Sequence, residues 1–162
     1  MFDFHMHTQL SFDGKETALA MAQAALSKGL KEICFTDHRD YDPMDPSHKL
    51  HFDPADYGRE YDLLEVPGLI IRKGFEFGML PDNREQFRKD VSRREWDFVI
   101  GSVHFVDGLD VYFGEYWEGK TPYQAILRSF EDTLRCLKTH DDFDVLGHLT
   151  YLGKCDANPE KK

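Results

Sequence analysis

Residues 2–8 of the chain read Phe-Asp-Phe-His-Met-His-Thr, and this stretch decides the fold prediction. Apolar and polar residues alternate through it, and a period of two predicts a short β-strand. Residues two positions apart on a strand point to the same face, so His5 and His7 should project together. Two imidazoles on one face can hold one divalent metal ion. Two polar residues on the solvent face of an edge strand would give the same pattern.

Four further segments are predicted to be strands, and each one ends in a histidine or a glutamate. Their apolar runs lie at residues 33–35, 69–76, 98–104 and 143–146, and helices are predicted at 18–27, 81–95 and 122–139, with a short one near 55–64. Strand and helix in alternation predict a parallel sheet. The side chains at the four strand ends are His38, Glu76, His104 and His148. Because the carboxyl ends of parallel strands open on one face, we expect these side chains to converge with His5 and His7.

Size and composition indicate one globular domain, residues 1–162. The chain is 41% hydrophobic and 14% aromatic, which is typical of a folded protein. No apolar run reaches transmembrane length and no leader peptide is evident, so we expect a cytoplasmic protein without a membrane partner. The net charge of −10 argues against nucleic acid as a partner but allows a small anionic substrate at a metal site.

The candidate ligands are imidazoles and carboxylates without cysteine, which suits zinc first and iron or manganese as alternatives. Glu76 is the carboxylate that ends a strand without a histidine beside it, and we expect it to bridge two ions. His48 and His51 lie in the long segment 39–67, where we expect solvent-exposed side chains.

These strand ends, taken in order, resemble the motifs of the PHP (polymerase and histidinol phosphatase) superfamily, and its histidinol-phosphatase branch in particular. The motifs are His5-x-His7-Thr8, Thr36-Asp37-His38, Gly74-x-Glu76, Ser102-x-His104 and Gly147-His148. The resemblance implies an α/β fold, a distorted TIM-like (β/α)7 barrel with up to three metal ions. It assigns the first ion to His5, His7 and Glu76, and the second to Glu76, His104 and His148. Asp13 and His38 fall to the third ion, and Asp37 would orient a neighbouring imidazole.

One family motif, an Asp-x-His on a later strand, does not occur after His148 in this chain. We therefore expect an N-terminal portion of such a barrel, truncated to about five βα units. The open edge of a sheet left in this way can pair with another chain, so a homo-oligomer or a complementing C-terminal segment is an expected partner.

The activity that the resemblance implies is metal-dependent phosphatase chemistry on a small-molecule phosphate monoester. L-histidinol phosphate and water would give L-histidinol and phosphate, a step of histidine biosynthesis. Glu76, His38 and Arg39 are the expected catalytic residues, with Arg39 as a phosphate clamp or, equally, an exposed loop arginine. The alternatives are another PHP phosphoesterase, either a nuclease or a sugar-phosphate phosphatase, and a non-catalytic metal-binding module.

Overall fold

A computed structural model describes residues 1–45, 47 and 49–155 of the chain. His48 and the last seven residues of the expected domain lie outside the described residues. Contrary to expectation, His51 is half-buried, with its ring stacked on Tyr41 at a centroid distance of 4.7 Å. Within the described ranges, no helix has the length and apolar character needed to cross a membrane.

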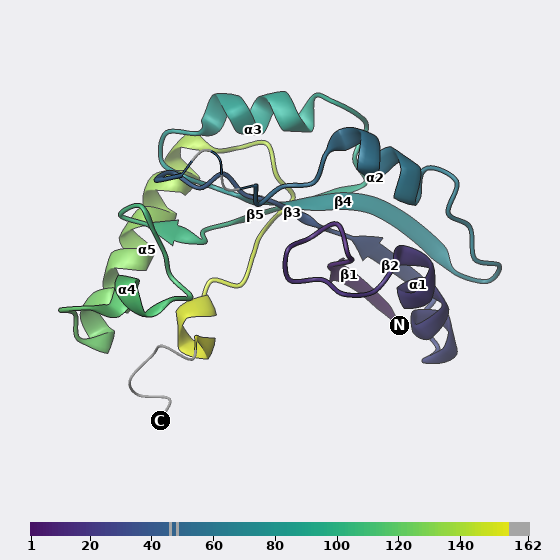
Figure 1. Cartoon of the computed structure of the whole chain (residues 1–162), viewed down its shortest axis with the longest axis horizontal. Helices are drawn as coiled ribbons and strands as arrows, with labels where there is room; N and C mark the ends of the chain where they lie inside the picture. Colours follow the sequence, from purple (N-terminus) through teal and green to yellow (C-terminus); the bar gives the residue numbers. More distant parts are fainter. Residues whose placement is uncertain (46, 48, 156–162) are drawn as a thin grey trace.

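A parallel sheet forms the centre of the molecule, as predicted. Its strands are β1 (Phe2–Met6), β2 (Glu32–Phe35), β3 (His38–Arg39), β4 (Ile70–Gly78), β5 (Phe98–Ser102) and β8 (Val145–Leu146). They run in the order β1-β2-β4-β5-β8, and the short β3 pairs with β4 beyond the end of β2. The sheet curls into half of a barrel (Figure 1). A separate antiparallel hairpin follows β5 and consists of β6 (Phe105–Val106) and β7 (Leu109–Asp110).

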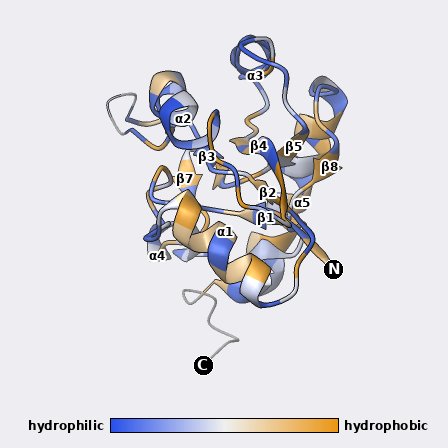
Figure 2. Cartoon of the chain, turned by 90° about the vertical axis from the view of Figure 1, so that its right-hand side faces the viewer, coloured by the Kyte–Doolittle hydropathy of each residue, from blue (hydrophilic) through white to orange (hydrophobic). Residues whose placement is uncertain are grey.

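Most of the helices lie around the outer side of this curved sheet (Figure 1). The helices are α1 (Ala18–Ser27), α2 (Pro54–Tyr61), α3 (Arg84–Val91), α4 (Gly114–Trp117) and α5 (Pro122–Thr139), followed by the 3-10 turn η1 (Tyr151–Lys154). Helix α4 instead lies beside the β6–β7 hairpin and α5 (Figure 1). Thr17 caps α1, because its side chain accepts a hydrogen bond from the Ala20 N–H at 3.2 Å. Figure 2 shows that α1 carries mainly apolar residues and α3 mainly polar ones.

Strand β4 separates the core from the inner side of the curved sheet. Phe75 and Phe77 are fully buried and pack with Phe87 of α3 on the outer side. Glu76 lies between them in the sequence, so it points to the opposite, inner face. Aromatic burial therefore fixes the register that turns the Glu76 carboxylate inward.

Helix α5 has the predicted bounds, but its apolar stripe faces outward. Phe130, Leu134 and Leu137 are between 37% and 54% exposed. The buried face of α5 consists instead of small and polar residues, among them Ala125 and Thr133. The helical spacing of apolar residues thus identifies the helix but not the side that packs on the sheet.

Candidate metal centre

The ends of the parallel strands bring all the predicted ligands together on the inner face of the sheet. Strand β3 pairs with β4 so that His38 lies directly beside Glu76. His5 and His7 come from the end of β1, with ring centroids 4.9 Å apart. The remaining ligands, His104 and His148, follow β5 and β8, and their ring centroids are 5.2 Å apart. Five imidazoles therefore surround one fully buried carboxylate.

The two oxygens of Glu76 divide four of these imidazoles into two pairs. Oε2 lies 3.1 Å from His7 Nε2 and 3.7 Å from His5 Nε2. Oε1 lies 2.7 Å from His148 Nε2 and 3.3 Å from His104 Nε2. His38 Nδ1 also lies 3.6 Å from Oε2. A carboxylate with imidazoles at both oxygens has the arrangement expected of a bridge between two cations.

Asp13 reaches the same cluster from the loop between β1 and α1. Its carboxylate lies 3.1 Å from His7 Nδ1 and 3.6 Å from His38 Nε2. The ring of Phe12 stacks on the His38 ring at a centroid distance of 4.7 Å. Asp13 and His38 therefore meet as the resemblance implies, beside the group that surrounds Glu76.

The electrostatics of the cluster favour positive charge. Burial acts to raise the pKa of Glu76, but His104, His148 and His7 outweigh it and hold the pKa well below the usual range. Burial likewise acts to lower the pKa of His7, and the carboxylates of Asp13 and Glu76 raise it to about 9. In the metal-free protein His7 therefore holds a proton that a divalent cation can replace, whereas burial lowers the pKa of His5.

The donor set fits a divalent metal by a further criterion. His7 Nε2, His38 Nδ1 and Glu76 Oε2 are buried, and although each has an oppositely charged neighbour about 3.1 Å away, none makes a hydrogen bond of acceptable geometry within the described residues. Ligand atoms of these three residues lie within 4.8 Å of one another, and so do those of His5, Glu76 and His148. Buried polar atoms without partners are costly, and one cation shared by them would remove that cost. Imidazole nitrogen and carboxylate oxygen are ligands that zinc accepts.

Three side chains that support the cluster are not identified by the strand-end rule. Thr36 Oγ1 lies 2.9 Å from His5 Nδ1 and orients that ring. Ser102 Oγ donates a 2.6 Å hydrogen bond to Glu76 Oε1. The third side chain is Asp40, which contacts two of the imidazoles. Gly147 provides the space for Ser102, because a Cβ at position 147 would lie 2.0 Å from Ser102 Oγ.

The expectation that Asp37 orients an imidazole is wrong. Its buried carboxylate accepts hydrogen bonds from the Thr8 N–H at 2.6 Å, from Ser11 Oγ at 2.8 Å and from the Tyr61 hydroxyl. Ser11 Oγ in turn accepts the His38 N–H at 2.9 Å. Asp37 therefore fixes the loop that carries Asp13, rather than a ring.

Arg39 is not brought to the cluster, so its expected role as a phosphate clamp is not supported. The guanidinium is buried, with 2.9 Å between Arg39 Nη2 and Asp90 Oδ1, and it donates a further bond to the Phe52 carbonyl at 2.8 Å. The reason is strand alternation, because Arg39 pairs with Phe77 on β4 and shares its outer face. Arg39 is a structural residue of the core.

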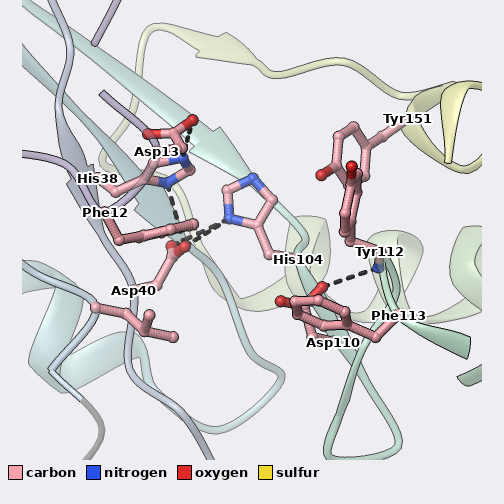
Figure 3. A pocket seen from close by; sticks show the side chains of 10 residues that line it. Phe12, Asp13, His38, Asp40, His104, Asp110, Tyr112, Phe113 and Tyr151 are labelled. Carbon is pink, nitrogen blue, oxygen red and sulfur yellow. Dashed lines mark hydrogen bonds and ion pairs between the residues drawn. The ribbon is translucent and has the colours of Figure 1, made fainter. Parts of the chain in front are cut away.

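A cavity of about 370 Å³ opens beside the cluster. Figure 3 shows His38, Asp13 and Asp40 on one side of it and the β7 segment with Tyr151 on the other, with His104 between them. The full lining is Phe12, Asp13, His38, Asp40, Leu50, His104, Asp110, Tyr112, Phe113 and Tyr151. The cavity therefore has residues of the candidate metal centre on one side and mainly aromatic side chains on the other.

The chain is similar to known proteins in both sequence and fold. The model of the PHP domain family matches residues 3–161. The chain is 30% identical to a probable histidinol-phosphatase of Clostridium acetobutylicum, over 97% of this chain and 60% of the relative. It is 28% identical to the histidinol-phosphatase of Lactococcus lactis, over 98% of this chain and 60% of that one. The chain thus spans about 60% of the length of these curated relatives. The crystal structure of histidinol phosphate phosphatase from L. lactis, complexed with zinc, L-histidinol and phosphate, superposes with a TM-score of 0.86 at 28% identity, over 94% of this chain and 59% of that one.

Proposed function

Since this chain belongs to the PHP domain family, we propose that it is a metal-dependent phosphoric monoester hydrolase that converts L-histidinol phosphate and water to L-histidinol and phosphate. The observation that carries the proposal is the gathering of five imidazoles around the buried Glu76. Similarity to histidinol-phosphatases over nearly the whole chain supports the choice of substrate. We assign the site to a single domain, residues 1–162.

We further propose zinc as the cofactor, with iron or manganese as alternatives. His5 and His7 would hold one ion with Glu76 Oε2, and His104 and His148 a second with Oε1. Asp13 and His38 are the residues that would contribute to a third. When bound, zinc supplies Lewis-acid stabilisation of charge on phosphoryl oxygens and makes water acidic enough to act as a nucleophile near neutral pH.

The residues around the ions have two tasks, which are to hold the ligands and to limit the access of water. Ser102 fixes one oxygen of Glu76, which leaves the carboxylate no freedom to rotate away from the imidazoles. Phe12 covers His38 by ring stacking. Around the buried Glu76, each electrostatic interaction with a phosphate would be stronger than it is in water.

The far wall of the cavity suits a substrate that carries an aromatic ring and an ammonium group, as L-histidinol phosphate does. Tyr112, Phe113 and Tyr151 offer rings for stacking. Asp110 offers a carboxylate, and its backbone contact with the Tyr112 N–H at 2.8 Å fixes its direction. A charge-assisted hydrogen bond from the substrate ammonium to Asp110 would stabilise binding by roughly 1.5–3 kcal/mol.

The test is steady-state hydrolysis by the zinc-loaded chain, with L-histidinol phosphate, p-nitrophenyl phosphate, a sugar phosphate and a DNA oligonucleotide as substrates. We expect the highest kcat/KM for L-histidinol phosphate. Asp110→Asn keeps the acceptor for Tyr112 and removes the charge, so it should raise KM for L-histidinol phosphate about 10-fold or more and leave KM for p-nitrophenyl phosphate unchanged.

Two results would overturn the proposal. Selective cleavage of the oligonucleotide or of the sugar phosphate would assign the site to another phosphoesterase. Stoichiometric zinc binding without turnover of any of the four substrates would make the chain a non-catalytic metal-binding module.

A further inference from the structure

Asp40 is a buried carboxylate that no strand-end motif includes. It follows β3 directly and lies two residues after His38, so its side chain shares the inner face with that ligand. Only 2% of Asp40 is exposed. Its two oxygens lie 3.1 and 3.0 Å from His104 Nδ1, and Oδ2 is also 3.1 Å from His38 Nδ1 (Figure 3). One carboxylate thus contacts two rings that come from different strands.

The contact with His104 has a chemical consequence for that ring. A neutral imidazole that donates its Nδ1–H to a carboxylate keeps its lone pair on Nε2. His104 Nε2 is the atom that faces Glu76 Oε1, at 3.3 Å, and His148 Nε2, at 3.5 Å. The hydrogen bond to Asp40 therefore selects the tautomer that can bind a cation at the shared carboxylate.

We propose that Asp40 is a positioning residue of the metal centre, which fixes the tautomer and orientation of His104 and couples them to the position of His38. This inference rests on the proposed metal binding and adds a residue that the family motifs do not supply. A carboxylate behind a metal-binding histidine raises the basicity of the ring, and its loss lowers metal affinity by about 10- to 100-fold.

A glycine next to Asp40 leaves room for its carboxylate. Gly78, the last residue of β4, lies beside Asp40, and a Cβ at position 78 would come within 2.2 Å of Asp40 Oδ1. Gly78 does not have a positive φ, so its backbone does not itself require glycine. The backbone of Asp40 is also fixed, because its N–H donates to the Leu50 carbonyl at 3.1 Å. The missing side chain at position 78 is explained by the presence of the Asp40 carboxylate.

The test measures zinc affinity by competition with a chromophoric chelator, together with the ¹⁵N shifts of the His104 ring by NMR. Asp40→Leu removes both acceptors at similar size, and it should weaken zinc binding about 10- to 100-fold. Asp40→Asn keeps one acceptor for His104 and should lie between the wild type and Asp40→Leu. Gly78→Ala should behave like Asp40→Leu, whereas Gly153→Ala, which would meet no atom within 4 Å, is the matched control and should bind as the wild type does.

The NMR readout separates positioning from packing. With zinc bound, we expect the ring of His104 to carry its one proton on Nδ1 in the wild type and to lose this uniform state in Asp40→Leu and Gly78→Ala. In the Asp40→Ala background, Gly78→Ala should have little additional effect, because the clashing oxygen is gone. This double variant also decides the matter if Gly78→Ala alone does not fold.

Three results would overturn the inference. Equal zinc affinity in wild type and Asp40→Leu would show that Asp40 has no role at the centre, and equal losses in Asp40→Leu and Asp40→Asn would leave only a packing or charge role. Loss of a whole equivalent of zinc at saturation would make Asp40 a ligand instead. If the wild type itself binds no zinc, the proposed function falls, and this inference falls with it.

Discussion

Replacing Glu76 with glutamine tests the centre most directly, because it changes one charge and almost no volume. The carboxylate is fully buried, accepts a hydrogen bond from Ser102 and faces imidazoles at both oxygens. Glutamine keeps a single acceptor oxygen and presents an NH₂ group where the second oxygen stood. In either orientation of the amide, the imidazoles on one side of residue 76 face an NH₂ group in place of a carboxylate oxygen.

The size of the effect on the metal-free protein can be worked out from the His7 pKa. A shift of this pKa from 6.5 to about 9 is equivalent to about 3 kcal/mol at 1.4 kcal/mol per unit, and Glu76 shares it with Asp13. His104 and His148 lose the same counter-charge. We therefore expect Glu76→Gln to lower the free energy of unfolding at pH 7 by roughly 3–5 kcal/mol, the usual cost of breaking a buried ion pair.

The assay is urea unfolding in the presence of a chelator at pH 7 and pH 10, followed by zinc analysis of the reloaded protein. The cost should be smaller at pH 10, where the His7 imidazole is neutral even in the wild type. Zinc content should fall by at least one ion per chain. Glu118→Gln, at an exposed position, is the matched control and should change neither quantity. An unfolding cost that is equal at both pH values, or wild-type zinc content and affinity, would refute the reasoning.

Three further predictions concern the metal-free fold and the residues around the centre. The raised pKa of His7 contributes stability that is complete below pH 6.5 and is lost as the pH rises through about 9, so the urea midpoint of the chelator-treated protein should fall across that window; a constant midpoint would contradict it. Arg39→Ala removes one of the two guanidinium groups that contact the buried Asp90, since Arg93 Nε stays 3.2 Å from Asp90 Oδ1, and it should cost roughly 1.5–3 kcal/mol in unfolding experiments with unchanged zinc stoichiometry. An intact Tm with a raised KM for phosphate esters would instead restore the clamp role. Ser102→Ala removes the hydrogen bond to Glu76 and should weaken zinc binding about 10-fold in a chelator competition, while an unchanged affinity would mean that the carboxylate needs no support.

Most residues of the candidate metal centre could be predicted from the sequence, because they are histidines and a glutamate at the ends of predicted strands. Alternation at His5 and His7 and the placement of Glu76 after an apolar run are local patterns, and the parallel sheet converts them into one cluster. The same alternation rule, applied to the two residues after His38, would have turned Arg39 away and pointed Asp40 inward. The strand there is two residues long, too short to show a periodic pattern.

Other features depend on tertiary packing that no local pattern encodes. Asp37 stands beside the proposed ligand His38 in the sequence, but its partners are Thr8, Ser11 and Tyr61, which lie on other segments. The outward face of α5 is a similar case, because the spacing of Phe130 and Leu134 is the same whichever side packs on the sheet. Such contacts depend on which segments meet in the folded chain. The sequence shows only that these side chains are able to make them.

Side chains that follow β1 and β8, at opposite edges of the sheet, both contact Glu76, and this has a consequence for the order in which the chain folds. His5 and His7 leave the ribosome early, whereas His148 is made much later and is attached to β8, a strand with only two paired residues against β5. A cation bound at Glu76 and His148 would stabilise the association of β8 with the rest of the sheet. Removal of the cation should therefore free the β8 end before the β1 end, and amide exchange near Leu146 would be the first to quicken.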